Sequence, residues 1–160
     1  MRQLWCNWIP EMRILCLCES NKETSMWYHY AEQYKGIVIE LSCCDELDSV
    51  WLGAEPINYI ESVPEISTAQ GWAQMLFMPN NKQIFNKLFK LCCYSKTPDW
   101  RYEKEWRVAT FKRPHEIGTI SDFKFHYKEL KSIFLGPLIA STERAEILLL
   151  AKELTPHTFI

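Results

Sequence analysis

Two glutamates, Glu103 and Glu105, stand two residues apart in the segment RYEKEWR. In an extended chain alternate side chains share a face, so the two glutamates would lie on one face with Arg101 and Arg107. A carboxylate fixed beside a developing positive charge is a means of electrostatic catalysis. Alternating acids and bases also build a charge ladder on a strand, where each contact contributes about 0.2–1 kcal/mol. Both interpretations stay open from the residues alone.

A second stretch, MWYHYAEQYKG, places aromatic residues beside a histidine and a lysine. Tyr28 and His29 lie off the main apolar face of the expected helix, so they are the candidates to face a ligand. His29 would serve as an acid or base, and Lys35 would contact an anion. The alternative is a helix that packs on a sheet through its other aromatic side chains, Trp27, Tyr30 and Tyr34.

Lys96 and Trp100 flank Pro98 in a predicted turn, where they would form one wall of the same pocket. A tryptophan after a proline turn also serves as a plug for the core. With His29, Lys35, Glu103, Glu105 and Arg107 they complete the polar pocket that we predict.

The seven cysteines include the adjacent pairs Cys43–Cys44 and Cys92–Cys93, and their odd number favours reduced, mostly buried thiols over a disulfide framework. Zinc sites usually carry Cys-x-x-Cys or His-x-x-x-His spacing, which this chain lacks. Cys16 and Cys18 would instead share one face of a strand in the core. We therefore expect no metal.

The composition predicts one globular domain over residues 1–160, with 48% hydrophobic and 24% charged residues. A net charge of -2 disfavours nucleic acid as a partner. Nucleic-acid binding would depend on a lysine patch of Lys82, Lys87 and Lys90 that continues to Tyr94 and Lys96. No apolar run reaches the length of a membrane span and no signal peptide is recognisable, so we expect a cytoplasmic protein without membrane contact.

The elements that must position these residues are strands and helices in mixed order. Strands are expected at 13–19, 37–42, 56–61, 105–111, 123–130 and 132–136. Helices are expected from a capping box at Ser20 and Glu23 to Gly36, at 45–53, at 80–94, and at 141–154. The last helix would be capped by Ser141 or Thr142 and would bury its ILLL run. Residues 62–79 are expected to be mainly loop, with room for a short helix. The fold class is thus α+β: a mostly antiparallel or mixed sheet of five or six strands with three or four helices.

Four segments, CLCES, MWYHYAEQYKGIVIE, YSKTPDWRYEKEWRV and KSIFLG, occur in this order. Together they resemble the bacterial and phage family called domain of unknown function 2971, from residue 12 to about residue 150. Members of that family usually begin with a further Tyr-rich strand and a Phe-Asn-Asp-Pro-Phe-Glu-like motif, which this chain lacks. The resemblance implies either a shortened member of the family or one whose missing part is supplied or replaced by a partner protein.

The Glu-x-Glu that leads into a strand is similar to the catalytic element of ADP-ribosyltransferases. That resemblance implies an ADP-ribosyltransferase-like fold, with Glu105 stabilising the oxocarbenium-like charge as nicotinamide leaves NAD and Glu103 positioning the acceptor. Ser20, at the end of the CLCES strand, would be the serine of such a site.

Three functions therefore remain open: NAD-dependent ADP-ribosyl transfer or NAD cleavage in phage–host conflict, a non-catalytic protein-interaction module that binds a partner or inhibits a host or phage system, and, with weaker support, nucleic-acid binding.

Overall fold

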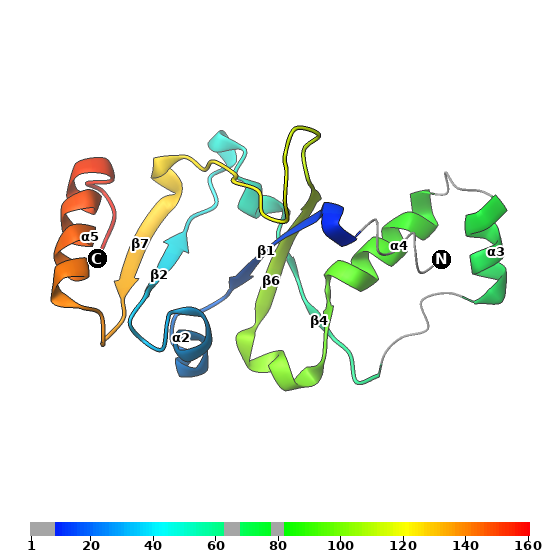
Figure 1. The fold of residues 1–160 in the computed structure, drawn as a ribbon, viewed down its shortest axis with the longest axis horizontal. Coiled ribbons are helices and arrows are strands. Elements are labelled where there is room, and N and C mark those ends of the chain that lie inside the picture. Colours follow the sequence, from blue (N-terminus) through cyan, green and yellow to red (C-terminus); the bar gives the residue numbers. More distant parts are fainter. Residues whose placement is uncertain (1–8, 63–67, 78–81) are drawn as a thin grey trace. The chain divides into compact units, whose positions relative to one another are not determined.

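The computed structural model describes residues 9–62, 68–77 and 82–160, and within them the fold is α+β with seven strands (Figure 1). The chain forms two compact units. Unit 1 comprises Met1–Leu17 and Glu55–Thr119, and unit 2 comprises Cys18–Ala54 and Ile120–Ile160.

Unit 1 contains two small sheets. The first has the strand order β1-β6-β3, with β1 at Met12–Cys18, β6 at Glu105–Phe111 and β3 at Glu55–Pro56. The second pairs β4, Asn58–Tyr59, in parallel with β5, Ser95–Lys96. The helical elements of unit 1 are η1 at Ile9–Glu11, α3 at Ala69–Phe77, α4 at Lys82–Cys93 and the 3-10 helix η4 at Pro98–Glu103.

The core of unit 1 lies where α4 runs into β5. Ile57, Cys93 and Tyr94 are buried, and Phe89 and Ala109 are among the residues that pack against them. The Tyr94 hydroxyl accepts a hydrogen bond from the Ala109 backbone N–H at 3.2 Å. This contact fixes the end of α4 against β6, which carries Glu105 and Arg107.

Unit 2 is built on one antiparallel pair, β2 at Ile37–Leu41 and β7 at Leu130–Leu135. The C-terminal tail runs along the other edge of β7, where Ser132 and Phe159 form a parallel bridge. The remaining elements are α2 at Thr24–Tyr30, the 3-10 helices η2 at Asp45–Leu47, η3 at Val50–Gly53 and η5 at Tyr127–Glu129, and α5 at Ser141–Leu154.

A left-handed turn follows α2. Glu32, Gln33 and Tyr34 have φ values of 47°, 53° and 70°, a conformation that costs non-glycine residues roughly 1–2 kcal/mol each. The backbone N–H of Leu138 bonds to the Tyr34 carbonyl at 3.1 Å. A Cβ at Gly136 would stand 2.1 Å from that same carbonyl oxygen, so the close approach of the loop after β7 requires glycine.

Several expected elements are confirmed: the strands β1, β2, β6 and β7, and the helices α4 and α5. The other expectations need correction. The expected helix to Gly36 ends at Tyr30, because the left-handed turn interrupts it. The capping box at Ser20 is wrong, since Glu23 is the N-cap and makes no side-chain bond there.

The C-terminal half brings further corrections. The expected strand at 123–130 is irregular chain followed by η5, where His126 and Glu129 form a capping box. The segment 56–61 is divided between β3 and β4, which belong to different sheets. The N-cap of α5 is Ala140 without a side-chain bond, and α5 exposes most of the leucines that were expected inside. Of the expected loop at 62–79, residues 63–67 and 78–79 lie outside the described part and Ala69–Phe77 form α3.

Candidate functional site

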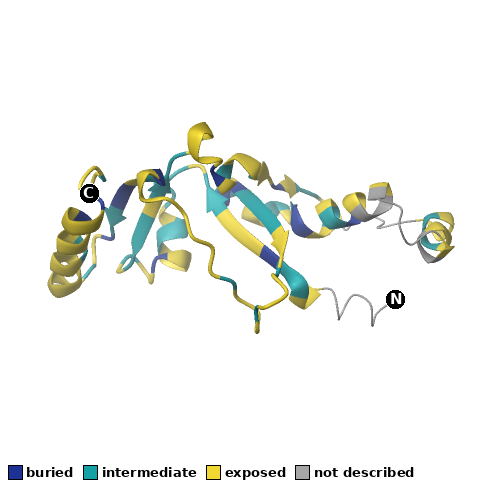
Figure 2. Ribbon diagram, turned by 90° about the horizontal axis from the view of Figure 1, so that it is seen from above, coloured by how far each residue is buried: buried dark blue, intermediate teal, exposed yellow. Residues whose placement is uncertain are grey.

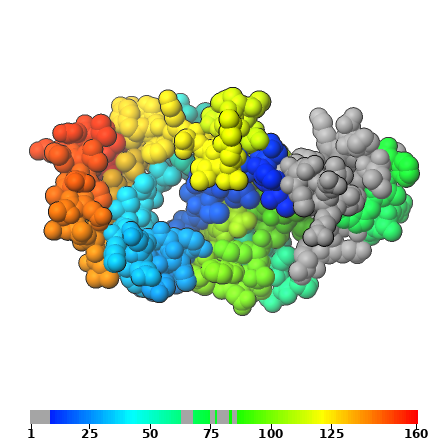
Figure 3. All heavy atoms as spheres, in the orientation of Figure 1, coloured from blue at the N-terminus to red at the C-terminus, as the bar shows by residue number. Residues whose placement is uncertain are grey.

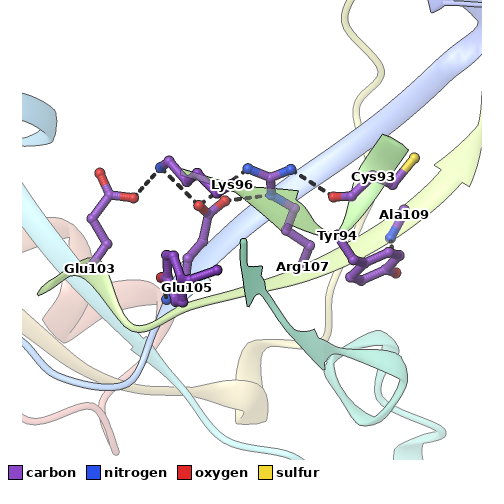
Figure 4. A network of polar contacts seen from close by, with 8 residues as sticks. Cys93, Tyr94, Lys96, Glu103, Glu105, Arg107 and Ala109 are labelled. Carbon is purple, nitrogen blue, oxygen red and sulfur yellow. Dashed lines mark hydrogen bonds and ion pairs between the residues drawn. The ribbon is translucent and has the colours of Figure 1, made fainter. Parts of the chain in front are cut away.

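The candidate site in unit 1 is an ionic cluster of four side chains, which we call the ion cluster: Lys96, Glu103, Glu105 and Arg107 (Figure 4). Lys96 ends β5, and the two glutamates and the arginine come from the end of η4 and the start of β6. The ion cluster therefore fastens three elements of unit 1 to one another.

Arg107 binds both the Glu105 carboxylate and the backbone. Its Nε donates to Glu105 Oε1 at 2.6 Å and its Nη2 to Oε2 at 3.2 Å, which is a two-point contact. Its Nη1 donates to the carbonyl oxygen of Cys93 at 2.6 Å. The guanidinium thus ties β6 to the last residue of α4.

Lys96 joins the two carboxylates. Its ammonium donates to Glu105 Oε2 at 3.0 Å and also to Glu103 Oε2. Lys104, with φ of 44°, is left-handed and turns the chain between the two glutamates. The Lys96 ammonium also lies 4.7 Å from the centroid of the Trp100 ring, a cation–π contact.

Burial makes these contacts strong. Glu103 and Glu105 are only 3% and 5% exposed. Burial by itself would raise the pKa of Glu105, but hydrogen bonds from Arg107, Cys16 and Lys96 and the charge of Arg107 outweigh it and lower the pKa to about 2. Glu105 is therefore a carboxylate at any physiological pH.

The pKa values of the two cations, Lys96 and Arg107, are raised, whereas that of Glu105 is lowered. Burial would lower the pKa of Lys96, whereas its hydrogen bonds to Glu103 and Glu105 raise it above the usual value. The pKa of Arg107 is raised by Glu105 against the effect of its burial. Two carboxylates face one ammonium and one guanidinium, so the ion cluster carries no net charge.

Chemically, Glu105, Lys96 and Arg107 hold their charges at neutral pH, because the pKa of Glu105 is lowered and the pKa values of Lys96 and Arg107 are raised. Both oxygens of Glu105 already accept bonds from Arg107, and Oε2 also accepts one from Lys96. A substrate that needs this carboxylate must displace the Lys96 ammonium, whose side chain is 19% exposed. In its present state the ion cluster links β5, the end of η4 and β6.

The sequence predicted most members of the ion cluster, but on the assumption that their segment is extended. Glu103, Glu105 and Arg107 do come together, with Lys96 and Trp100 beside them, but residues 98–103 form η4 instead of an extended ladder. Arg101 lies apart and pairs with the exposed Glu61 at 3.7 Å. The catalytic and binding roles assigned to the site residues stay predictions.

The other predicted site residues belong to unit 2. Tyr28 and His29 are exposed on α2, with ring centroids 5.4 Å apart in an edge-to-face contact. Ser20 forms a local turn, in which its hydroxyl accepts the backbone N–H of Lys22 at 3.1 Å. The Lys35 side chain is exposed beside the left-handed turn.

Sequence reasoning missed two contacts of Glu105. The thiol of Cys16, on β1, hydrogen-bonds to the Glu105 carboxylate. The residue is exposed as a whole, yet its sulfur is desolvated; this desolvation and the neighbouring Glu105 raise the pKa of the thiol to about 11. The backbone N–H of Glu105 donates to the Tyr59 hydroxyl at 2.9 Å. Strand alternation in RILCLC was the only signal for Cys16 in the sequence.

The cysteines differ from expectation. The six in the described part are free thiols, but only Cys93 is buried, so the expectation of mostly buried thiols is wrong. Residues 9–62, 68–77 and 82–160 contain no group of three His, Cys, Asp or Glu side chains arranged to hold a metal ion. Nor does this part of the chain contain a helix that is long and apolar enough to cross a membrane.

Two lysines of the proposed nucleic-acid patch have carboxylate partners. Lys90 donates to Glu55 at 2.7 Å, and Lys96 belongs to the ion cluster. Lys87 is exposed, and the side chain of Lys82 lies outside the described part. The carboxylate partners of Lys90 and Lys96 reduce the positive potential that this patch would present to a phosphate backbone.

Comparison with known proteins gives one match. The sequence model of the family described as "Protein of unknown function (DUF2971)" matches residues 26–108, which is more than half of the chain and includes all four members of the ion cluster. No curated protein and no solved structure matches the chain.

Proposed function

The chain belongs to the DUF2971 family, and from this premise and the geometry of its motif we propose that it acts as a non-catalytic protein-interaction domain. The observation that carries the proposal is that the charged side chains of the family motif bind one another. The family match ends in the segment that holds Glu103, Glu105 and Arg107, and these side chains are bound to one another and to Lys96. They support the fold and leave recognition to other surfaces.

The exposed apolar residues support the same proposal. Large side chains in unit 2 remain at the surface, among them Tyr28, Tyr30, Ile39, Leu149 and Leu150. Isolated exposed apolar residues are ordinary on proteins, but several on one element indicate a contact surface. The partner is then a protein, and the interaction inhibits or completes a larger system.

NAD-dependent ADP-ribosyl transfer, or NAD cleavage in phage–host conflict, is the second candidate. Its support is that Glu105, with a pKa of about 2, is a fixed anion suited to a developing oxocarbenium charge. In that reaction the bond between ribose and nicotinamide breaks, its electron pair leaves with nicotinamide, and water or an acceptor oriented by Glu103 adds to the ribose. Lys96 would first have to leave Glu105.

Nicotinamide release from NAD distinguishes the two candidates. We expect no release from the native protein, alone or with cell extract. The Glu105→Gln variant is compared at a temperature where circular dichroism shows it folded, and Glu61→Gln, which changes an exposed carboxylate of unit 1, is the matched control. Release by the native protein and Glu61→Gln that disappears in Glu105→Gln would overturn the proposal and favour NAD chemistry.

A positive test of the interaction follows from cross-linking the tagged chain in cells that express it. The proposal expects one protein at near-stoichiometric yield, and the purified pair should reassociate in vitro. Recovery of only abundant, substoichiometric proteins would contradict an interaction function.

A further inference from the structure

We propose that the exposed face of α5 docks a protein segment that presents apolar side chains flanked by lysine or arginine. The inference rests on the proposed interaction function and names its surface and the chemistry of its partner. Figure 2 shows α5 as almost entirely exposed, although it is rich in leucine.

The leucines of α5 are unusually accessible for a helix in a folded domain. Leu148, Leu149, Leu150 and Leu154 are 40%, 58%, 53% and 68% exposed. Leucine is among the residue types most often buried, and Leu149 and Leu150, the two that lie away from the attached side of α5, mark a face that lacks its cover. In the space-filling view the atoms of α5, in orange, are open to view (Figure 3).

The helix is attached to unit 2 by the opposite, narrow side. Ala151 and Thr155 are buried and Ile147 is half-buried, at spacings of four residues. This spacing defines one stripe along a helix. Leu149 and Leu150 lie away from that stripe, so their exposure follows from how α5 packs and is not caused by fraying at a helix end.

Acidic residues lie among the exposed leucines. Glu146 and Glu153 are each three or four positions from Leu149 and Leu150, which makes them neighbours on the helix surface. Glu143, one turn earlier, is also exposed. The basic residues of α5 are Arg144, on the side of the buried stripe, and Lys152, which borders Leu149 but not Leu150, so only acids border both leucines. None of the ion pairs among the described residues involves α5, so these carboxylates remain available to a cationic partner.

Charge complementarity argues against a second copy of this chain. If two α5 helices packed antiparallel about Leu149 and Leu150, Glu146 of one would face Glu153 of the other. A parallel pair in register would place each glutamate against itself. Like charges at a contact are costly in both arrangements. The same carboxylates are repelled by anionic membranes, whose interfacial helices carry lysine and arginine instead.

The test uses two synthetic amphipathic peptides of the length of α5, 14 residues, one built of leucine and lysine and the other of leucine and glutamate. Fluorescence anisotropy measures their binding to the full native chain. We expect the leucine–lysine peptide to bind, with affinity that falls as salt rises, and the leucine–glutamate peptide to bind at least about tenfold more weakly. Binding of neither peptide, or equal binding of both, would overturn the proposal.

A charge exchange adds specificity to the test. The Glu146→Lys/Glu153→Lys variant should reverse the preference between the peptides, and Leu150→Glu should weaken leucine–lysine binding by about tenfold or more. Asp45→Lys/Glu46→Lys makes the same charge change on an exposed turn of unit 2 and should leave the preference unchanged. An unaltered preference in the α5 variant would refute the assignment of the surface.

Two further outcomes would also refute it. Light scattering that shows a dimer lost in Leu150→Glu would make a second copy the occupant, and α5-dependent binding to vesicles of anionic lipid would make it a membrane. Neither result would disturb the interaction function itself, which only nicotinamide release or a failure to recover a partner contradicts.

Discussion

The ion cluster of unit 1 buries charged side chains, whereas helix α5 of unit 2 exposes apolar ones. In the ion cluster, groups that water solvates well are buried and neutralise one another. In α5, leucines that water solvates poorly stand at the surface beside acids without ion partners among the described residues. A motif that looks reactive is thus bound within the fold, whereas a plain leucine run is left exposed.

The largest effect should come from breaking the ion cluster. Glu105→Gln leaves Arg107 and Lys96 with a neutral partner in a buried site, and we expect the free energy of unfolding to fall by about 3 kcal/mol or more. Glu61→Gln removes the exposed pair with Arg101 and should cost under about 0.5 kcal/mol. Urea denaturation measures both, and equal losses would erase the distinction between buried and exposed carboxylates.

Helix α5 should show a similar contrast between its two sides. Ala151→Glu places a charge on the buried stripe and should destabilise the protein by about 2 kcal/mol or more. Leu154→Glu, at a position 68% exposed, should change stability by less than about 0.5 kcal/mol. Thermal unfolding followed by circular dichroism compares them. A large loss in Leu154→Glu would mean that this leucine already has a cover.

Acid should remove the contribution of Glu105 in a defined pH window. Its pKa is about 2 in the folded protein against 4.5 for a free group, so the carboxylate stabilises the native state above about pH 4.5. This contribution decreases as the pH falls from 4.5 towards 2. The difference in unfolding free energy between the native protein and Glu105→Gln should shrink over that window. A constant difference down to pH 2 would show that the native-state pKa is not lowered.

The smallest effect concerns the thiol beside Glu105. With a pKa of about 11, Cys16 is almost wholly protonated at neutral pH and should react with iodoacetamide more slowly than glutathione does. Peptide mapping by mass spectrometry follows its labelling against pH. Rapid labelling at pH 7 would place the thiol away from the carboxylate.

The sequence predicted elements well where local pattern and burial agree. The bounds of β6, Glu105–Phe111, and of α5, Ser141–Leu154, match the expected ranges. The exposed side of α5 could not be predicted, because the ILLL run is apolar on every face and burial depends on what packs against it. The turn after Tyr30 was missed because three residues other than glycine adopt positive φ.

The sequence predicted which residues form the candidate site better than it predicted how they are arranged. Lys96 joins Glu103 to Glu105, which binds Arg107 directly. The left-handed Lys104 after η4 turns the chain between the two glutamates, and a lysine does not predict that conformation. The contact from Cys16 comes from a strand about 90 positions away, which strand alternation cannot locate.

The most direct test of the account is binding of the leucine–lysine peptide to three folded proteins: native, Glu105→Gln and Leu150→Glu. If recognition lies on α5 and the ion cluster is structural, Glu105→Gln binds like the native protein at a temperature where it is folded, and Leu150→Glu loses about tenfold or more. Loss of binding in Glu105→Gln with full retention in Leu150→Glu would contradict the account.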